Sequence, residues 1–105
     1  THDEILRHEM VEVQTLDDFL DARPPPFPIA FIKMDVEYNE LNVLRGATRT
    51  LQHHNWPTML LESNHDSDQG AHQALVDFLK NELGYLVIPV HGCDNMYLAV
   101  YEKHA

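Results

Sequence analysis

The sequence predicts an α/β protein, in which helices pack against a layered sheet whose last strand is antiparallel. Two observations support this class. Segments with the apolar pattern of strands alternate with segments whose apolar residues repeat at helical spacing, as in strand–helix–strand units with right-handed crossovers. The last two strand segments, in contrast, are separated by a short polar turn, so they are expected to form a hairpin.

Length and composition fit a single domain over residues 1–105. Of the 105 residues, 44% are hydrophobic, which is enough for one core. The net charge of −10 is spread over both halves and leaves no basic face, so nucleic acid is not an expected partner. No stretch approaches the roughly 20 apolar residues of a membrane span, so no membrane association is expected. A single cysteine allows no intrachain disulfide, which fits a cytoplasmic protein.

The first elements are a strand, a short helix and a stiff connector. Val11 and Val13 alternate with polar residues, as in a half-buried strand. Thr15 is expected to begin a helix, because Thr15 and Asp18 match a capping box with a carboxylate at the third helical position. The segment PPPFP, residues 24–28, must follow the end of this helix, because proline removes backbone donors and disfavours helical angles in the preceding residue.

The middle of the chain predicts a buried strand and a helix. Residues 29–36, IAFIKMDV, are nearly continuous in apolar side chains, which fits a strand covered on both faces. From Asn39 to about His53 the apolar residues recur at helical spacing, and Gly46 is the only weak helix former in this segment. One helix is therefore expected over residues 39–53.

The remaining segments predict a second strand, a helix and a hairpin. Residues 58–63, TMLLES, have the composition of a strand. Asp66 begins a helix, with a capping-box partner three positions on, and Gly84 is suited to end that helix. Residues 85–90 and 96–101 are expected to be the two strands of the hairpin.

The residues that leave the two buried strands are the candidates for chemistry, because ligands of open α/β sheets collect at the carboxyl ends of strands. They are Asp35 and Glu37 after the first strand, and Glu62, Asn64 and His65 after the second. If the two strands are parallel neighbours, both groups meet at one edge of the sheet. By spacing alone, a structural network that includes an ion pair between Lys33 and Asp35 explains these charges as well.

Eight histidines raise the question of a metal site, but their spacing does not favour one. None has the two-plus-two spacing of a structural zinc site. Asn64, Asp66 and Asp68 begin like a calcium loop, but Gln69 and Leu75 stand where glycine and the bidentate glutamate belong. The chain also lacks a serine nucleophile elbow and a glycine-rich phosphate loop. No residue is therefore assigned as a metal ligand.

Residues 31–47 read FIKMDVEYNELNVLRGA. This segment resembles the hallmark of the FkbM family of S-adenosylmethionine-dependent methyltransferases, which is IKIDVEG followed by AE and then by LRGA or LKGA. Further similarities are VEVQTLDDFL over residues 11–20, PTMLLES over 57–63, and the closing segments GYLVIPV and DNMYLAVY over 84–90 and 94–101. The resemblance thus covers most of residues 11–101.

The resemblance implies a Rossmann-like methyltransferase of which this chain supplies the fourth to seventh strands. In that fold the segments 29–36, 57–63, 95–101 and 85–90 lie side by side in this order. The family's glycine-rich cofactor loop belongs to the first half of the fold and has no counterpart in this sequence. S-adenosylmethionine is therefore expected as the cofactor of the complete enzyme, whereas this chain alone is expected neither to bind it well nor to be active.

The resemblance also implies roles for the candidate residues. Asp35 and Glu37 match the DVE of the family and are expected to be catalytic, facing cofactor and acceptor. Glu62 matches a glutamate at the end of the family's next strand. Together with Asn64 and His65 it is expected to bind the acceptor, typically a hydroxyl group of a small molecule. His65 is a candidate base because of its position and has no counterpart in the family.

Tyr38 departs from the family motif, which has glycine at this position. Glycine would permit a positive φ or a close approach of the backbone, which tyrosine resists.

Two other functions remain open. Without a first half, the strand over Ile29–Met34 has an uncovered apolar edge. The alternative is therefore a non-catalytic module that self-associates or binds a partner across this edge. A metal or acidic-ligand binder built on the histidines is the third hypothesis.

Overall fold

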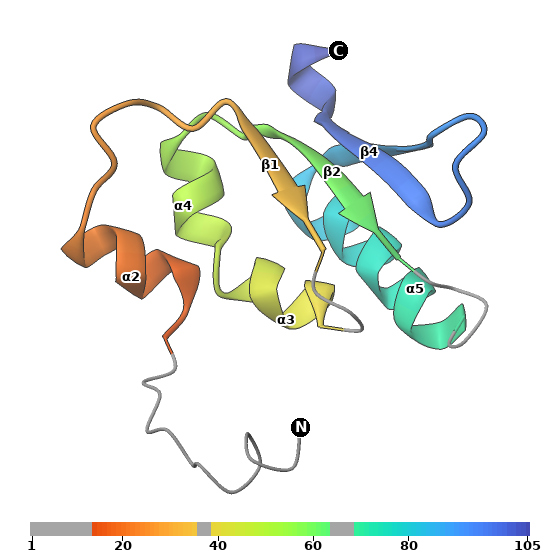
Figure 1. Ribbon diagram of the computed structural model, residues 1–105, viewed down its shortest axis with the longest axis horizontal. Coiled ribbons are helices and arrows are strands. Elements are labelled where there is room, and N and C mark those ends of the chain that lie inside the picture. The colour runs from red at the N-terminus through yellow and green to blue at the C-terminus, as the bar shows by residue number, and fades with distance from the viewer. Residues whose placement is uncertain (1–13, 36–38, 64–68) are drawn as a thin grey trace, which may run out of the picture.

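Four strands form one mixed sheet in the computed structural model, which describes residues 14–35, 39–63 and 69–105 (Figure 1). The strands are β1 (Phe31–Met34), β2 (Thr58–Glu62), β3 (Tyr85–Pro89) and β4 (Met96–Tyr101). The helices are α2 (Leu16–Ala22), α3 (Glu40–Arg45), α4 (Thr48–His53) and α5 (Gln69–Asp77), followed by the π-helical η1 (Phe78–Leu83) and the 3-10 turn η2 (Glu102–His104). None of the helices in these residues is long and apolar enough to cross a membrane.

The strand order is β1-β2-β4-β3. Strands β1 and β2 are parallel, and β4 is antiparallel to both of its neighbours. The predicted order of the four segments, the hairpin and the antiparallel last strand are therefore confirmed. Strand β1 lies at one end of the sheet, so one of its two edges has no strand partner among the described residues.

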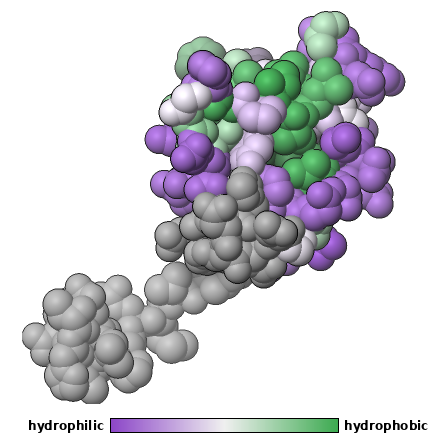
Figure 2. All heavy atoms as spheres, turned by 90° about the vertical axis from the view of Figure 1, so that its right-hand side faces the viewer, coloured by the Kyte–Doolittle hydropathy of each residue, from purple (hydrophilic) through white to green (hydrophobic). Residues whose placement is uncertain are grey.

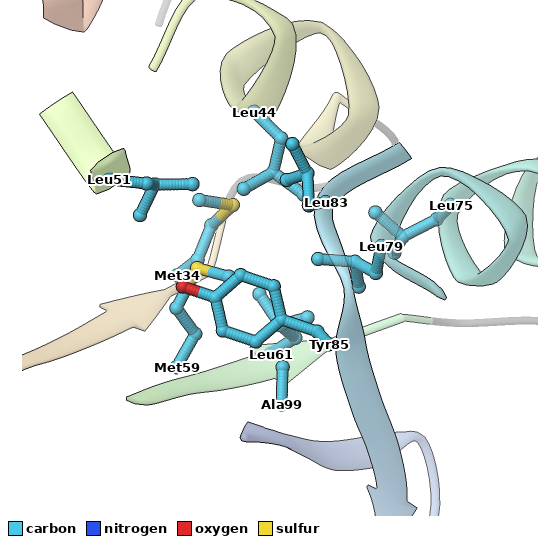
Figure 3. Packing of buried hydrophobic residues seen from close by; sticks show 10 residues of the cluster. All are labelled: Met34, Leu44, Leu51, Met59, Leu61, Leu75, Leu79, Leu83, Tyr85 and Ala99. Atoms are coloured by element: carbon cyan, nitrogen blue, oxygen red, sulfur yellow. The ribbon is translucent and has the colours of Figure 1, made fainter. Parts of the chain in front are cut away.

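The hydrophobic core lies on one face of the sheet. Met59 of β2 is opposite Ile32 of β1 and Ala99 of β4, and because side chains alternate along a strand, these residues share a face. Helix residues pack onto that face to complete the core (Figure 3). Its buried members are Met34, Leu44, Leu51, Met59, Leu61, Leu75, Leu79, Leu83, Tyr85 and Ala99.

Tyr85 is a polar member of this core. Its hydroxyl donates a 2.8 Å hydrogen bond to the carbonyl oxygen of Pro57, which satisfies the buried group. Burial, followed by the proximity of Tyr101, raises the pKa of the Tyr85 hydroxyl well above its usual range. Tyr85 therefore acts as a neutral donor that ties the start of β3 to the segment before β2.

The opposite face of the sheet is less well covered. Phe31, Leu86 and Ile88 on this face have exposed fractions of 54%, 37% and 46%, and Leu60 and Leu98 beside them are partly buried. The expectation that the strand at 29–36 is covered on both faces is therefore wrong for the described residues. The helices that follow β1 and β2 contribute their apolar residues to the other face. Figure 2 shows apolar surface gathered between hydrophilic borders on the side of the molecule that lies to the right in Figure 1.

Helix α2 is fixed to helix α4 by a buried carboxylate. Thr15 caps α2 as predicted, because its Oγ1 accepts a hydrogen bond from the Asp18 amide at 3.1 Å. Asp17, with an exposed fraction of 5%, accepts hydrogen bonds from the amides of Arg49 and Thr50 at 3.1 and 2.7 Å. These amides belong to the first turn of α4, which has no side-chain cap of its own. Asp17 thus caps a helix that begins about 30 residues later.

The predicted single helix over residues 39–53 is wrong: the chain forms α3 and α4 with a break at Gly46–Ala47. The break has a tertiary cause. A Cβ atom at Gly46 would lie 2.9 Å from the Cβ of Thr15, so glycine permits the start of α2 to approach. The Gly46 carbonyl, released from the helix, accepts a 2.8 Å hydrogen bond from the Asp17 amide.

The second half of the chain follows the prediction closely. Gly84 has φ of 86° and ends η1 with its amide donating to the Leu79 carbonyl, so the predicted cap is confirmed. In the hairpin turn, Gly92 and Asn95 have positive φ values of 80° and 65°. The predicted strand around Val11 and the predicted helix start at Asp66 lie outside the described residues.

We predict that Asp17→Ala lowers the free energy of unfolding by about 1–3 kcal/mol, because two buried amides lose their acceptor. The matched control is Asp18→Ala, whose exposed carboxylate makes only a surface ion pair with Arg49 and whose loss should cost much less. Urea denaturation of the three proteins measures both effects. Equal losses in the two variants would show that Asp17 does not cap α4.

Candidate functional site

The parallel pair β1–β2 brings two of the predicted residues to the same edge of the sheet. Met34 is paired with Leu61, so the next positions along the two strands are Asp35 and Glu62. Both residues are exposed. Because the carboxyl ends of adjacent parallel strands form the usual ligand crevice of open α/β sheets, this edge is the candidate functional site. We call it the carboxylate rim, and it consists of Asp35, Glu62 and the neighbouring Glu40.

Glu40 is the buried member of the carboxylate rim. It is the first residue of α3 and has an exposed fraction of 7%. Burial raises the pKa of its carboxyl group, and the nearby charges of Asp35 and Glu62 raise it further, against an opposing contribution from backbone hydrogen bonds. A carboxyl group with a raised pKa exchanges protons closer to neutral pH than an ordinary glutamate does.

Sequence reasoning did not select Glu40, although a signal was present. In the resemblance to the FkbM family, Glu40 occupies the position of the glutamate in the AE that follows IKIDVEG. Periodicity alone marks it as a surface position at a helix start, where acidic residues are common for electrostatic reasons. Its burial in the folded chain is not visible in that pattern.

A second polar group lies beside the rim at the end of β2. Ser63, with an exposed fraction of 5%, has its Oγ 2.9 Å from Nδ1 of His72 in α5. The Ser63 amide donates to the carbonyl of Asn95 at 2.8 Å, which connects this corner to the hairpin turn. The His72 ring lies 4.9 Å from the ring of Tyr97. The nine-residue separation of Ser63 and His72 matches no motif, so sequence reasoning missed this pair.

The other predicted site residues are less informative. Glu37, Asn64 and His65 lie outside the described residues. Within residues 14–35, 39–63 and 69–105, no ion pair joins Lys33 to Asp35, so that part of the structural interpretation is wrong. The same residues contain no group of three histidine, cysteine, aspartate or glutamate side chains placed to hold a metal ion.

A cleft of about 600 Å³ lies away from the rim, between α2, the proline-rich connector and α4. Its cation, Arg49, is already held by Asp21 at 2.6 Å, Asp18 at 3.4 Å and Asp17 at 3.9 Å. These carboxylates raise the pKa of the Arg49 guanidinium, chiefly through the hydrogen bond with Asp21. The cleft is therefore lined by a neutralised structural network, and the rim remains the better candidate.

The fold and the rim together define a class of protein. A mixed sheet flanked by helices, with carboxylates at the ends of two parallel strands, is compatible with part of a Rossmann-like methyltransferase. The chain matches the sequence profile of the methyltransferase FkbM domain over residues 2–87, and it belongs to this family. Neither the curated proteins nor the solved structures yield a match.

We predict that Glu40→Gln becomes more stable relative to the wild type as pH rises. Because the pKa of Glu40 is raised in the folded state, that state binds more protons than the unfolded chain at pH values between the ordinary and the raised pKa. Wild-type stability is therefore lost as pH rises through this interval, whereas glutamine has no such term. Urea denaturation from pH 4 to pH 8 measures the difference. A difference that is constant with pH, or that grows toward acid, would contradict the burial of an ionisable Glu40.

Proposed function

We propose that this chain is the carboxy-terminal part of an S-adenosylmethionine-dependent methyltransferase that methylates a hydroxyl group of a small molecule. The carrying observation is the carboxylate rim, where Asp35 and Glu62 end adjacent parallel strands and both act on the pKa of the buried Glu40. In this proposal Asp35 and Glu37 are catalytic, while Glu62, Asn64 and His65 bind the acceptor. The family membership supports the reaction class.

The chemistry of O-methylation suits a carboxylate rim. S-adenosylmethionine supplies a methyl group bonded to a positively charged sulfur. The acceptor hydroxyl must lose its proton, and a carboxylate within hydrogen-bond reach can hold or accept that proton. Asp35 is exposed at the rim and accessible to such a hydroxyl, whereas Glu40 lies beneath it. Most of the rate enhancement is expected from alignment of donor and acceptor, which is worth roughly 7–11 kcal/mol in favourable cases.

The described residues do not make a complete cofactor site. A glycine-rich turn after a strand lets the backbone approach a bound cofactor, but the glycines of this chain serve other purposes. Gly46 separates α3 from α4, Gly70 lies in α5, Gly84 ends η1 and Gly92 lies in the hairpin turn. We infer that the cofactor is held mainly by polypeptide that pairs with the free edge of β1.

The handedness of crossovers supports this inference. The connections from β1 to β2 and from β2 to β3 place their helices on the core face and extend the sheet away from β1. A right-handed unit that extends the sheet in the other direction places its helices on the opposite face. That face carries the exposed Phe31 and the partly buried Leu60 and Leu98. One added half would thus cover both the free edge and the apolar face, and create the ligand crevice at the end of β1.

We predict that the chain alone shows no saturable binding of S-adenosylmethionine in titration calorimetry up to about 1 mM, a range that corresponds to roughly −4 kcal/mol. Joined to polypeptide that contains a strand and a glycine-rich loop, read from the coding region upstream of Thr1, it should bind the cofactor and transfer labelled methyl groups. If the 105-residue chain alone binds S-adenosylmethionine with ordinary affinity, the proposal that the cofactor is held mainly by other polypeptide is refuted.

In that longer protein, Asp35→Asn should reduce methyl transfer by about 10²–10⁴-fold, the usual contribution of a positioned acid or base. The matched control is Asp21→Asn, which removes a carboxylate that pairs with Arg49 far from the rim. The control should retain activity. Equal activity of wild type and Asp35→Asn would exclude Asp35 from catalysis.

A non-catalytic interaction module is the second candidate, and one observation favours it. Strand β1 has a free edge beside Phe31, whose exposed fraction is 54%, and such edges are templates for pairing with another chain. In this proposal two copies associate through their β1 edges. The net charge of −10 opposes the association at low ionic strength, so added salt should strengthen it.

We predict concentration-dependent dimers in light scattering at moderate salt, and their loss in Phe31→Glu. Phe27→Glu is the matched control, because Phe27 is more exposed, at 77%, but lies outside β1. A wild-type chain that stays monomeric at high concentration would leave the edge without a role in self-association.

A further inference from the structure

A second cavity lies at the turn of the hairpin between β3 and β4. Its volume is about 400 Å³, within the roughly 300–1,000 Å³ of ligand pockets in proteins. The residues that line it belong to the segment 89–97, and they combine the apolar Pro89, Val90 and Tyr97 with the polar Asp94 and Asn95. None of the residues assigned above to catalysis or to acceptor binding lies in this segment.

The hairpin turn lies at the same end of the sheet as the carboxylate rim (Figure 1). Strand β4 is antiparallel to β2, so β4 begins where β2 ends, and Met96, which lines the cavity, is paired with Glu62 of the rim. The pairing continues beyond β2, because the Ser63 amide donates to the Asn95 carbonyl at 2.8 Å. The cavity is therefore next to the rim along the sheet, at the strand ends where ligands of open α/β sheets collect.

Hydrogen bonds within the hairpin turn shape the cavity. The Val90 amide donates to the Met96 carbonyl at 2.9 Å, and the Cys93 amide donates to the Val90 carbonyl at 3.1 Å. Gly92 and Asn95 have the positive φ values of the turn. The cavity is thus formed in the ligand-free chain, which reduces the cost of ordering the turn on binding.

Tyr97 is the aromatic residue of the cavity, and neighbouring elements hold its ring. The ring lies 4.9 Å from the ring of His72 in α5, with 43° between the two planes. The buried Ser63, which directly follows Glu62, has its Oγ 2.9 Å from Nδ1 of His72. The end of β2 and helix α5 therefore position Tyr97 beside the rim. A tyrosine ring that is already positioned offers a large contact area at a low entropic cost.

The charged groups at the hairpin turn and at the rim are acidic. Asp94 lines the cavity, is exposed and makes no ion pair with the described residues. In the part of the chain that the structure describes, no lysine or arginine lines the cavity. The charges that act on the pKa of Glu40 in the rim are those of Asp35 and Glu62, and both are negative. A ligand that carries phosphate or carboxylate would therefore meet like charges, which disfavour its binding.

We propose that the hairpin-turn cavity is a subsite for the part of the acceptor that does not react, and that it takes an uncharged ring that bears hydroxyl groups. The subsite rests on the proposed function, because it holds the molecule whose reacting hydroxyl group meets the rim. One face of the ring lies against Tyr97, and Asp94 and Asn95 hydrogen-bond to its hydroxyl groups. An aromatic ring and the carbon–hydrogen face of a sugar both offer such a surface. The carboxylate of Asp94 disfavours anionic analogues.

The test uses the full 105-residue chain without cofactor and two pairs of probes that differ in charge. One pair is 4-hydroxybenzyl alcohol and 4-hydroxybenzoate, and the other is methyl glucoside and glucose 6-phosphate, so the pairs distinguish an aromatic ring from a sugar. Amide chemical shifts in an NMR titration should show saturable binding of at least one neutral probe at residues 90–97, and about tenfold weaker binding of its charged counterpart. Absence of saturable shifts in this segment up to about 20 mM, or equal affinity within both pairs, would overturn the proposal.

Asp94→Asn tests the selection by charge. Because Asp94 is exposed, its replacement should leave the fold intact and reduce the discrimination against the charged probe several-fold. The matched control is Asp21→Asn, which changes the net charge by the same amount at the cleft beside α2 and should leave the discrimination unchanged. An equal effect of the two variants would show that the net charge of the chain selects the ligand, and would overturn the role of Asp94.

A second set of variants tests the positioned ring. Tyr97→Ala should weaken binding of the neutral probe about tenfold, whereas Tyr97→Phe retains the ring and should weaken it much less. Ser63→Ala removes the hydrogen bond to His72 and should weaken binding several-fold, and Ser63→Thr, which keeps a hydroxyl group, should restore part of the affinity. Equal affinity of wild type and Tyr97→Ala would exclude Tyr97 from the subsite.

These titrations require no methyl transfer, so the two proposals fail separately. Probe binding at the hairpin turn together with no methyl transfer by the longer polypeptide would leave a ligand site and refute the methyltransferase proposal. Methyl transfer by the longer polypeptide without probe binding at the hairpin turn would refute the subsite alone.

Discussion

The parallel pairing of β1 with β2 is the constraint on which the candidate site depends. It places Asp35 and Glu62 at the same edge of the sheet, close to the buried Glu40 at the start of α3. Burial raises the pKa of the Glu40 carboxyl group, and the nearby charges of Asp35 and Glu62 raise it further. A buried titratable group with like charges beside it is a feature by which candidate functional sites are recognised.

The rim is in turn positioned by a contact at some distance from it. Asp17 caps α4, and Gly46 lets α2 approach the break between α3 and α4. With α3 separated from α4, the two helices place Leu44 and Leu51 in the same core. The glycine of the LRGA motif and an aspartate of the TLDDFL segment therefore have a structural explanation: they form one tertiary contact at the point where α3 ends and α4 begins.

Much of the fold could be predicted from the sequence because its signals are local. Thr15 as a helix cap, Gly84 as a helix end and the hairpin are determined by the conformations of a few adjacent residues. The helix break at Gly46 could not be predicted, because it depends on Thr15, which is distant in sequence. The placement of Asp35 beside Glu62 followed from the expected strand order, whereas the burial of Glu40 and the Ser63–His72 pair arise from packing between elements.

The central claim is that the free edge of β1 is an internal edge of the sheet in the proposed methyltransferase. Amide hydrogen exchange over Phe31–Met34, measured in this chain and in the longer polypeptide read from upstream of Thr1, tests the claim directly. The account predicts that amides on the free side of β1 exchange rapidly in the 105-residue chain and become strongly protected in the longer polypeptide, because a new strand pairs with them. Unchanged exchange of β1 in the longer polypeptide would contradict it.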